Sequence, residues 1–291
     1  MRLDKPITEI IQQRFSCRTY LKKLIEDDHR KRLAGFLANL QEGPLGNRTR
    51  FELVAATSAD SANLKGLGTY GFIRNPAAFI IGTTFEGDKN LEDFGYQMEK
   101  AILSATDLGL GTCWLGGTFT KSKFAQKIDL SPDEIIPAVT SVGYIAKKPR
   151  WLDGEVRRIA NADRRLPWER LFFDTRLGTP LSKEQAGEYA LPIEMVRLAP
   201  SASNRQPWRI VRVEETWHFY LMRTPGYLNS NTARLLKLAD LQRVDMGIAM
   251  CHFELSARDA GLEGHWAVTK PDLYIPGKLT EYVVSWAAKV V

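Results

Sequence analysis

Apolar residues gather in short runs rich in valine, isoleucine and aromatic side chains, a composition typical of β-strands. Five such runs are FELVAAT at 51–57, AAFIIGTT at 77–84, WRIVRV at 208–213, WHFYLM at 217–222 and YVVSWAA at 282–288. A different pattern covers FGYQMEKAILSATDLGLG at 94–111, where small and apolar residues occupy more than one face of a helix. This segment is predicted to be a buried helix that ends near Gly109.

A second helix is predicted just before a proline-bracketed loop. Ser182 and Gln185 have the spacing of a capping box, which marks the start of a helix. Because Pro200 follows, the helix should end near Leu198 and Ala199. Helices and strands are thus mixed along the chain, and the predicted class is α+β.

The chain also repeats itself. Residues 93–114 align with residues 245–266 without a gap, and ten of the 22 positions are identical. Upstream, GPLGNRTRFELV at 43–54 aligns with PSASNRQPWRIV at 200–211. Each half then reads as a helix, a loop, a strand pair, a long apolar helix and a final strand. We therefore predict two half-folds, 1–175 and 176–291, that together form one compact unit.

Composition is that of a folded protein, because 44% of the 291 residues are hydrophobic and 25% are charged. The first residues lack the apolar core of a secretory signal, and no uncharged apolar run approaches the ~18 residues of a membrane span. Three scattered cysteines fit neither a disulfide framework nor a zinc site. We expect a cytoplasmic protein that is not in the membrane and holds no metal.

Net charge is +6, and residues 147–170 concentrate it with eight Lys or Arg against four Asp or Glu. Such a stretch suits a solvated face, a nucleic-acid contact or the attraction of phosphorylated small molecules. No nucleic-acid-binding module is recognisable, and few aromatic residues are interleaved with the charges. We therefore expect no nucleic-acid partner.

Five motifs follow one another along the chain: RFSCR at 14–18, LGLGTCWLGG at 108–117, the dipeptide GY at 143–144, RRLPWERLFF at 164–173 and APSASNRQPW at 199–208. Taken in this order, they resemble the nitroreductase family over nearly the whole chain. Ordinary members are homodimers that hold FMN at the subunit interface. Here the first half keeps RFSCR and the second keeps PSASNRQPW, so the resemblance implies a monomeric pseudo-dimer with one FMN site and one vestigial site.

Arg14, Ser16 and Arg18 alternate with Phe15 and Cys17, so in an extended backbone the three polar side chains point to one side. Guanidinium groups there suit phosphate or planar oxygens. The resemblance places Arg14 and Ser16 at the FMN phosphate and Arg18 at the pyrimidine edge of the flavin. The alternative is a surface strand that forms ion pairs.

Other cofactor contacts are implied by the same resemblance. A polar loop stiffened by prolines should surround the flavin ring and ribityl chain, and Leu115, Gly116 and Gly117 should let backbone approach the flavin. Arg165 should bind the phosphate. Each feature also has a plain structural alternative: a proline-bracketed turn, close backbone packing, and an exposed basic pair. The loop residues concerned are Pro200, Ser201, Ser203, Asn204 and Gln206.

The implied function is an FMN-dependent oxidoreductase that passes electrons from NADH or NADPH to a nitroaromatic, quinone or related acceptor. No side chain need act as a nucleophile, because the flavin carries the chemistry. Arg18 would support the reduced flavin. Two alternatives stay open: another flavin reaction, such as reductive dehalogenation or flavin reduction, and a flavin-binding or sensing protein without turnover.

Overall fold

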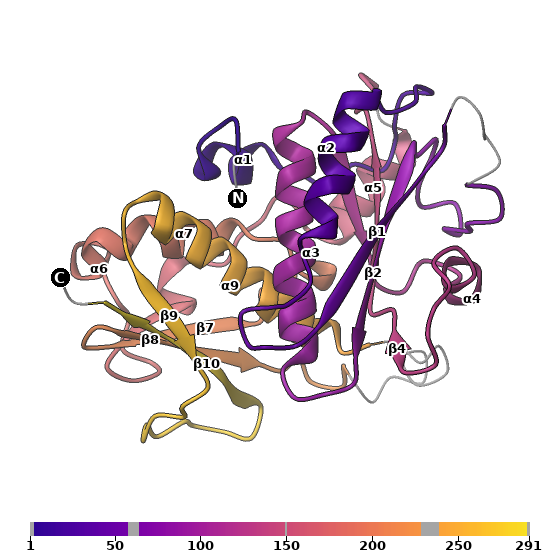
Figure 1. The fold of residues 1–291 in the computed structure, drawn as a ribbon. Coiled ribbons are helices and arrows are strands. Elements are labelled where there is room, and N and C mark those ends of the chain that lie inside the picture. Colours follow the sequence, from indigo (N-terminus) through magenta and orange to yellow (C-terminus); the bar gives the residue numbers. More distant parts are fainter. Residues whose placement is uncertain (1–2, 58–63, 149, 228–238, 290–291) are drawn as a thin grey trace.

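The computed structural model describes residues 3–57, 64–148, 150–227 and 239–289. Two antiparallel-rich sheets lie on the outside of the molecule, and two long helices lie between them (Figure 1). The described part of the chain has no helix long and apolar enough to cross a membrane.

The first sheet has the strand order β1-β2-β5-β3, and its neighbours are all antiparallel. A short strand, β4 (Glu134–Ile135), also pairs with β2. Helices α2 (Asp27–Ala38) and α3 (Asn90–Asp107) cover one face, and α4 (Lys121–Ala125) lies on the other (Figure 1). The four main strands are β1 (Thr49–Ala55), β2 (Ala78–Phe85), β3 (Gly111–Leu115) and β5 (Val139–Gly143).

The second sheet repeats the order of the first as β7-β8-β10-β9, again with antiparallel neighbours. Each predicted strand run falls within or across one of the observed strands, which confirms those predictions. The two-sheet arrangement also confirms the predicted α+β pseudo-dimer. The strands are β7 (Trp208–Val213), β8 (Thr216–Met222), β9 (Gly264–Ala267) and β10 (Thr280–Ala288).

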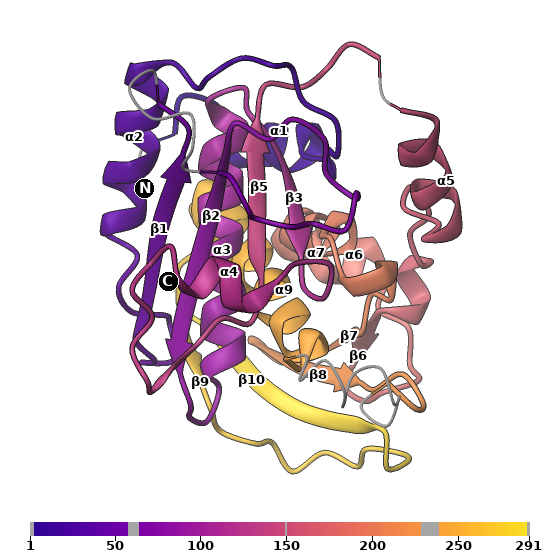
Figure 2. The same cartoon turned by 90° about the vertical axis from the view of Figure 1, so that its right-hand side faces the viewer.

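One strand joins the two halves. β6 (Phe172–Asp174) belongs to the predicted first half, yet it pairs in parallel with β7 of the second sheet. Before it come α5 (Trp151–Ile159), which stands at the right-hand edge of Figure 2, and a 3₁₀ turn, η1 (Trp168–Arg170). The last residues of the first half therefore add a strand to the sheet of the second half. The repeat alone does not predict this pairing.

The central contact is between α3 and α9 (Leu241–Asp259), the two copies of the repeated helix. A side chain on Gly95 would lie 2.2 Å from the Val244 carbonyl oxygen, and one on Gly247 would lie 1.9 Å from the Glu92 oxygen. In the repeat, Gly95 corresponds to Gly247 and Glu92 to Val244. The contact is therefore reciprocal, as at a twofold interface, and its closeness depends on the two glycines.

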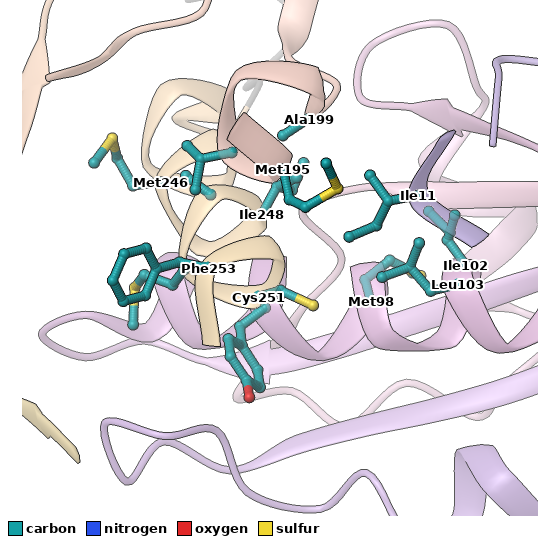
Figure 3. Close-up of a cluster of buried hydrophobic side chains, with 14 of the residues drawn as sticks. Ile11, Met98, Ile102, Leu103, Met195, Ala199, Met246, Ile248, Cys251 and Phe253 are labelled. Atoms are coloured by element: carbon teal, nitrogen blue, oxygen red, sulfur yellow. The ribbon is translucent and has the colours of Figure 1, made fainter. Parts of the chain in front are cut away.

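Around this crossing the two halves share one hydrophobic core. Side chains from the first helix, α1 (Ile7–Gln13), and from α3 meet side chains from α9 and α7 (Ala190–Leu198) (Figure 3). Burying such residues stabilises the folded state by ~25 cal/mol for each Å² of apolar surface removed from water. The halves are thus one packed unit. The labelled members are Ile11, Met98, Ile102, Leu103, Met195, Ala199, Met246, Ile248, Cys251 and Phe253.

The helix predicted from Ser182 starts and stops where expected, but it is not continuous. The capping box of Ser182 and Gln185 is present and opens α6 (Lys183–Ala186). A 3₁₀ turn, η2 (Gly187–Tyr189), then separates it from α7. Gly187 has a φ of 56°, which breaks the helix, and Pro192 fits the first turn of the new one.

Candidate functional site

A cavity of about 550 Å³ lies where the first half meets the second. Its wall combines the segment Arg14–Arg18, the end of β3, the stretch 156–165, the loop 200–204 and the start of α9. A volume of this size is typical of small-molecule sites, which span ~300–1,000 Å³. Eleven of the twelve site residues predicted from sequence contribute to it: Arg14, Ser16, Arg18, Leu115, Gly116, Gly117, Arg165, Pro200, Ser201, Ser203 and Asn204.

The Arg14–Arg18 segment runs beside β3 in extended form. The Cys17 amide donates to the Thr112 carbonyl at 2.8 Å, and Ser16 forms a parallel bridge with Thr112. This attachment turns the Cys17 side chain into the core. Arg14, Ser16 and Arg18 then line the cavity, as their alternation predicts.

Positive charge concentrates at one end of this cavity. Burial lowers the pKa of Arg14 and lowers the pKa of Arg165 to about 10, and the two guanidinium groups also repel each other. Arg157 lies in the same wall and forms an ion pair with Asp163. Within the described residues the Arg14 guanidinium makes no hydrogen bond, although its Nε atom is 3.8 Å from a Glu99 oxygen, and the buried Nε atom of Arg165 has no hydrogen-bond partner. Buried guanidinium groups with unused donors fit an anionic ligand.

The loop that faces these arginines has a strained backbone. Ser203, Asn204 and Gln206 have φ values of 50°, 53° and 50°, a region that residues other than glycine seldom adopt. The Ser201 hydroxyl accepts a hydrogen bond from the Gln206 amide at 2.8 Å, and the Ala202 amide donates to Asp245 at 2.9 Å. These bonds hold the loop against the start of α9. Strain maintained in this way is typical of binding loops.

Asn204 and Gln206 fasten the loop to the basic segment. The Asn204 amide donates to the carbonyls of Asn161 and Arg164 at 2.6 and 2.8 Å, and the Leu166 amide donates to the Gln206 side chain at 2.8 Å. Gln206 is buried and does not line the cavity, unlike the other predicted residues. Its side chain is committed to backbone partners, so its observed role is to position the loop.

Arg165 is held by the same junction. Its Nη atoms donate to the carbonyls of Ala162 and Leu198 at 2.8 and 3.1 Å, which leaves the buried Nε free. Arg165 is therefore not part of an exposed basic pair, which was the alternative to a phosphate-binding role.

Gly116 shows both features predicted for it. It lines the cavity, and it packs closely: a Cβ atom on Gly116 would lie 2.4 Å from the Leu241 side chain of α9.

Two aspartates at matching positions of the repeat have different surroundings. The Asp93 carboxylate accepts three hydrogen bonds at 2.8 Å, from the Leu45 amide and from the amide and side chain of Asn47. Among the described residues, Asp245 accepts one, from Ala202, and its Oδ2 atom has no hydrogen-bond partner. Asn204, the counterpart of Asn47, is bonded elsewhere. In the second half this aspartate thus keeps one bond to the loop, and it lines the cavity.

This difference predicts a pH effect. Burial raises the pKa of both aspartates, but hydrogen bonds from Asn47 and Leu45 oppose the rise at Asp93, whereas the pKa of Asp245, with Asp240 nearby, is raised well above its ordinary value. The folded state then retains a proton that the unfolded chain releases above pH ~4, so stability falls as pH rises by up to ~1.4 kcal/mol per pH unit. Asp245→Asn cannot ionise, and we expect its stability relative to wild type, measured by urea unfolding without ligand, to increase between pH 5 and pH 8.

Asp93→Asn is the matched control. Its new amide would face three N–H donors, so it should be less stable than wild type throughout this pH range. If the stability difference between Asp245→Asn and wild type were the same at pH 5 and pH 8, Asp245 would be an ordinary ionised carboxylate.

The corresponding loop of the first half does not form a comparable cavity in the part of the chain that is described. It borders a hollow of about 180 Å³ with Thr84 and Phe85. Asp93 ties Leu45 and Asn47 down, and Arg243 from α9 forms an ion pair with Glu92 at 2.6 Å beside it. The loop of the first half is therefore held by hydrogen bonds to Asp93 and lies beside an ion pair to the second half.

Among the wall residues that were not predicted from the sequence, three bear on the chemistry or packing of the cavity: Arg157, Leu241 and Asp245. Arg157 lies within the basic stretch 147–170, so charge density pointed to its region but not to the residue. The repeat aligned Asp245 with Asp93, but only the hydrogen bonds of the structure show that the two aspartates differ in their surroundings. Leu241 carries no chemical signal. Among the described residues, no group of three or more His, Cys, Asp or Glu side chains is placed to hold a metal ion.

Comparison with known proteins gives the family. A sequence model described as "Putative TM nitroreductase" matches residues 6–257. The fold is similar to the crystal structure of a putative nitroreductase from Thermotoga maritima, with a TM-score of 0.59 and 19% identity over 98% of this chain and 95% of that one. A search of curated proteins gave no match.

Two other solved structures are similar over about half of this chain. A nitroreductase family protein from Clostridium difficile has a TM-score of 0.40 and 17% identity, over 55% of this chain and 92% of its own. A nitroreductase from Bacteroides fragilis with bound FMN has a TM-score of 0.38 and 19% identity, over 50% and 91%. On the match over residues 6–257, the chain belongs to the nitroreductase family described as "Putative TM nitroreductase".

Proposed function

We propose that the cavity binds one FMN and that the protein is an FMN-dependent oxidoreductase. The observation that carries this proposal is the meeting of two separated motifs in one cavity, Arg14–Arg18 from the first half and 200–204 from the second. The cavity is large enough for such a ligand, and the unsatisfied arginine donors at one end suit its phosphate. The similar nitroreductase from Bacteroides fragilis binds FMN, which agrees with this cofactor.

Different residues would bind different parts of FMN. Arg14, Arg165 and Ser16 would bind the phosphate, and Arg18 would hold the pyrimidine edge, where its charge favours negative charge on the ring. Ser201, Ser203 and Asn204 would contact the ring and ribityl chain from the second half, opposite Gly116 and Gly117. Bound FMN would supply the hydride and electron transfer, while the protein orients it and excludes water.

We assign NADH or NADPH as the electron donor and a nitroaromatic, a quinone or a related small molecule as the acceptor. The two half-folds, 1–175 and 176–291, would act as a monomer, because the surface that separate subunits would share already lies inside the chain. The described cysteines are free and buried, which supports a cytoplasmic location.

Steady-state oxidation of NADH and NADPH by FMN-loaded protein tests this proposal. With a quinone or nitroaromatic acceptor present, we expect the protein to oxidise NADH or NADPH continuously and faster than the same concentration of free FMN does. Absence of turnover with a stoichiometrically bound flavin would favour the second candidate, a flavin-binding or sensing protein. Rapid turnover with free flavin or a halogenated compound as the acceptor would favour the other flavin reactions on this fold.

A further inference from the structure

Behind Arg14 lies a buried polar network that joins the two halves. Glu99 on α3 and His252 on α9 are both fully buried, and the Glu99 Oε1 atom lies 2.9 Å from the His252 Nε2 atom. Trp114 donates to the other Glu99 oxygen at 2.8 Å. The Arg14 Nε atom is 3.8 Å from Oε1, so the carboxylate lies between a guanidinium and an imidazole.

The hydrogen bonds of His252 restrict where its protons lie. Its Nδ1 atom is 2.9 Å from the Met195 carbonyl, which only accepts, so Nδ1 carries a proton. One further proton lies between Nε2 and Glu99 Oε1. The pair is therefore either an imidazolium with a carboxylate or a neutral imidazole with a carboxylic acid.

The surroundings of Glu99 decide between these two forms. Burial raises the pKa of Glu99, but the contacts with His252, Arg14 and Trp114 outweigh it, and the net pKa is lowered. The nearby Cys251 thiol is neutral, because burial raises its pKa well above the ordinary value. The Trp114 N–H and the Arg14 guanidinium both favour a carboxylate at Glu99, and with a carboxylate the hydrogen bonds of His252 place a proton on each ring nitrogen. One buried negative charge then stands against two positive charges, His252 and Arg14.

The Glu99–His252 pair is specific to one side of the pseudo-dimer, whereas the bond from tryptophan to glutamate recurs, because Trp266 donates to Glu254 at 2.6 Å. In the repeat, Glu99 corresponds to Cys251, and His252 corresponds to Lys100. Lys100 lies over the Tyr96 ring, 5.5 Å from its centroid, and does not reproduce the pair. A feature needed only to join two similar helices would have no reason to be asymmetric. Its asymmetry matches that of the cavity, which Arg14 lines.

We propose that Glu99 and His252 are positioning residues for the anion-binding end of the cavity. Glu99 holds the Nε edge of Arg14 and leaves its other N–H groups for the ligand. With a proton on each ring nitrogen, His252 offsets the negative charge of Glu99, so that Glu99 does not cancel the charge of Arg14. The anion expected there is the phosphate of FMN, so this inference rests on the proposed function.

Two measurements test the proposal together. Imidazole ¹⁵N NMR of the ligand-free protein at pH 7 should show both His252 nitrogens protonated. His252→Gln keeps an N–H for Glu99 but removes the charge, and we expect the FMN affinity to fall about tenfold relative to riboflavin. Lys100→Gln removes a positive charge from the matching position of the repeat and should leave the ratio of FMN to riboflavin affinity unchanged.

A neutral His252 in the folded protein would overturn the proposal, and so would an unchanged affinity ratio in His252→Gln. If that variant does not fold, the protonation state in wild type decides alone. A wild-type protein that binds neither flavin would overturn both this inference and the proposed function. FMN binding with a neutral His252 would leave the proposed function intact and remove only the role assigned here.

Discussion

Gly247→Ala is expected to lower the free energy of unfolding by about 3 kcal/mol, at the upper end of the range for overpacked cores. The added methyl group would lie 1.9 Å from the Glu92 carbonyl oxygen and 2.7 Å from the Tyr96 amide nitrogen. Both are backbone atoms of α3, so no side chain can move aside to make room. The two long helices must separate, and the shared core loosens with them. Urea unfolding followed by circular dichroism measures the loss.

Gly35→Ala is the control for glycine replacement in a helix. Gly35 lies in α2 with no atom within 4 Å of the position of an added Cβ. Alanine there should stabilise the protein by up to about 1 kcal/mol, because it favours the helix without a clash. If Gly247→Ala were as stable as Gly35→Ala, the close reciprocal crossing of α3 and α9 would not exist in solution.

Arg14→Ala should weaken FMN binding by ~1.5–3 kcal/mol, about ten- to 150-fold, and riboflavin binding much less. The Arg14 guanidinium is buried, lines the cavity and has no hydrogen bond within the described residues, so its donors are available to a phosphate. Riboflavin has no phosphate and loses nothing there. Glu99 keeps His252 and Trp114 as partners after the replacement, so the fold should survive. Fluorescence titration with both flavins measures the effect.

Arg18→Ala is the companion variant. Arg18 lines the same cavity but is assigned to the flavin ring, so its loss should weaken FMN and riboflavin alike. Equal losses of the two flavins in Arg14→Ala would remove the phosphate assignment. A selective loss of FMN in Arg18→Ala would reverse the proposed orientation of the ligand.

Much of the fold follows from local sequence patterns. Valine- and aromatic-rich runs predicted the strands, because that signal lies in neighbouring residues. The alignment of 93–114 with 245–266 predicted two similar halves. The helix break at Gly187 was not predicted; glycine permits the positive φ found there, but a glycine within a helical pattern does not by itself require a break. The pairing of β6 with β7 depends on how the chain crosses between the halves, which no local pattern encodes.

The site was predictable where a motif carries the chemistry in adjacent residues. Arg14, Ser16 and Arg18 share one side because an extended backbone alternates. Gln206 was assigned to the flavin, yet its side chain binds backbone groups of the segment at 164–166. The Glu99–His252 pair joins residues 153 positions apart, and only the packing of α3 on α9 brings them together.

The central claim is that two unlike halves of one chain form a single FMN site. Flavin released by denaturing the purified protein should be identified by chromatography and counted per chain, with the mass in solution measured by light scattering. We expect a yellow monomer that releases one FMN per chain. Two FMN per chain would contradict the closed site in the first half, and a folded chain that neither contains nor takes up FMN would contradict the account as a whole.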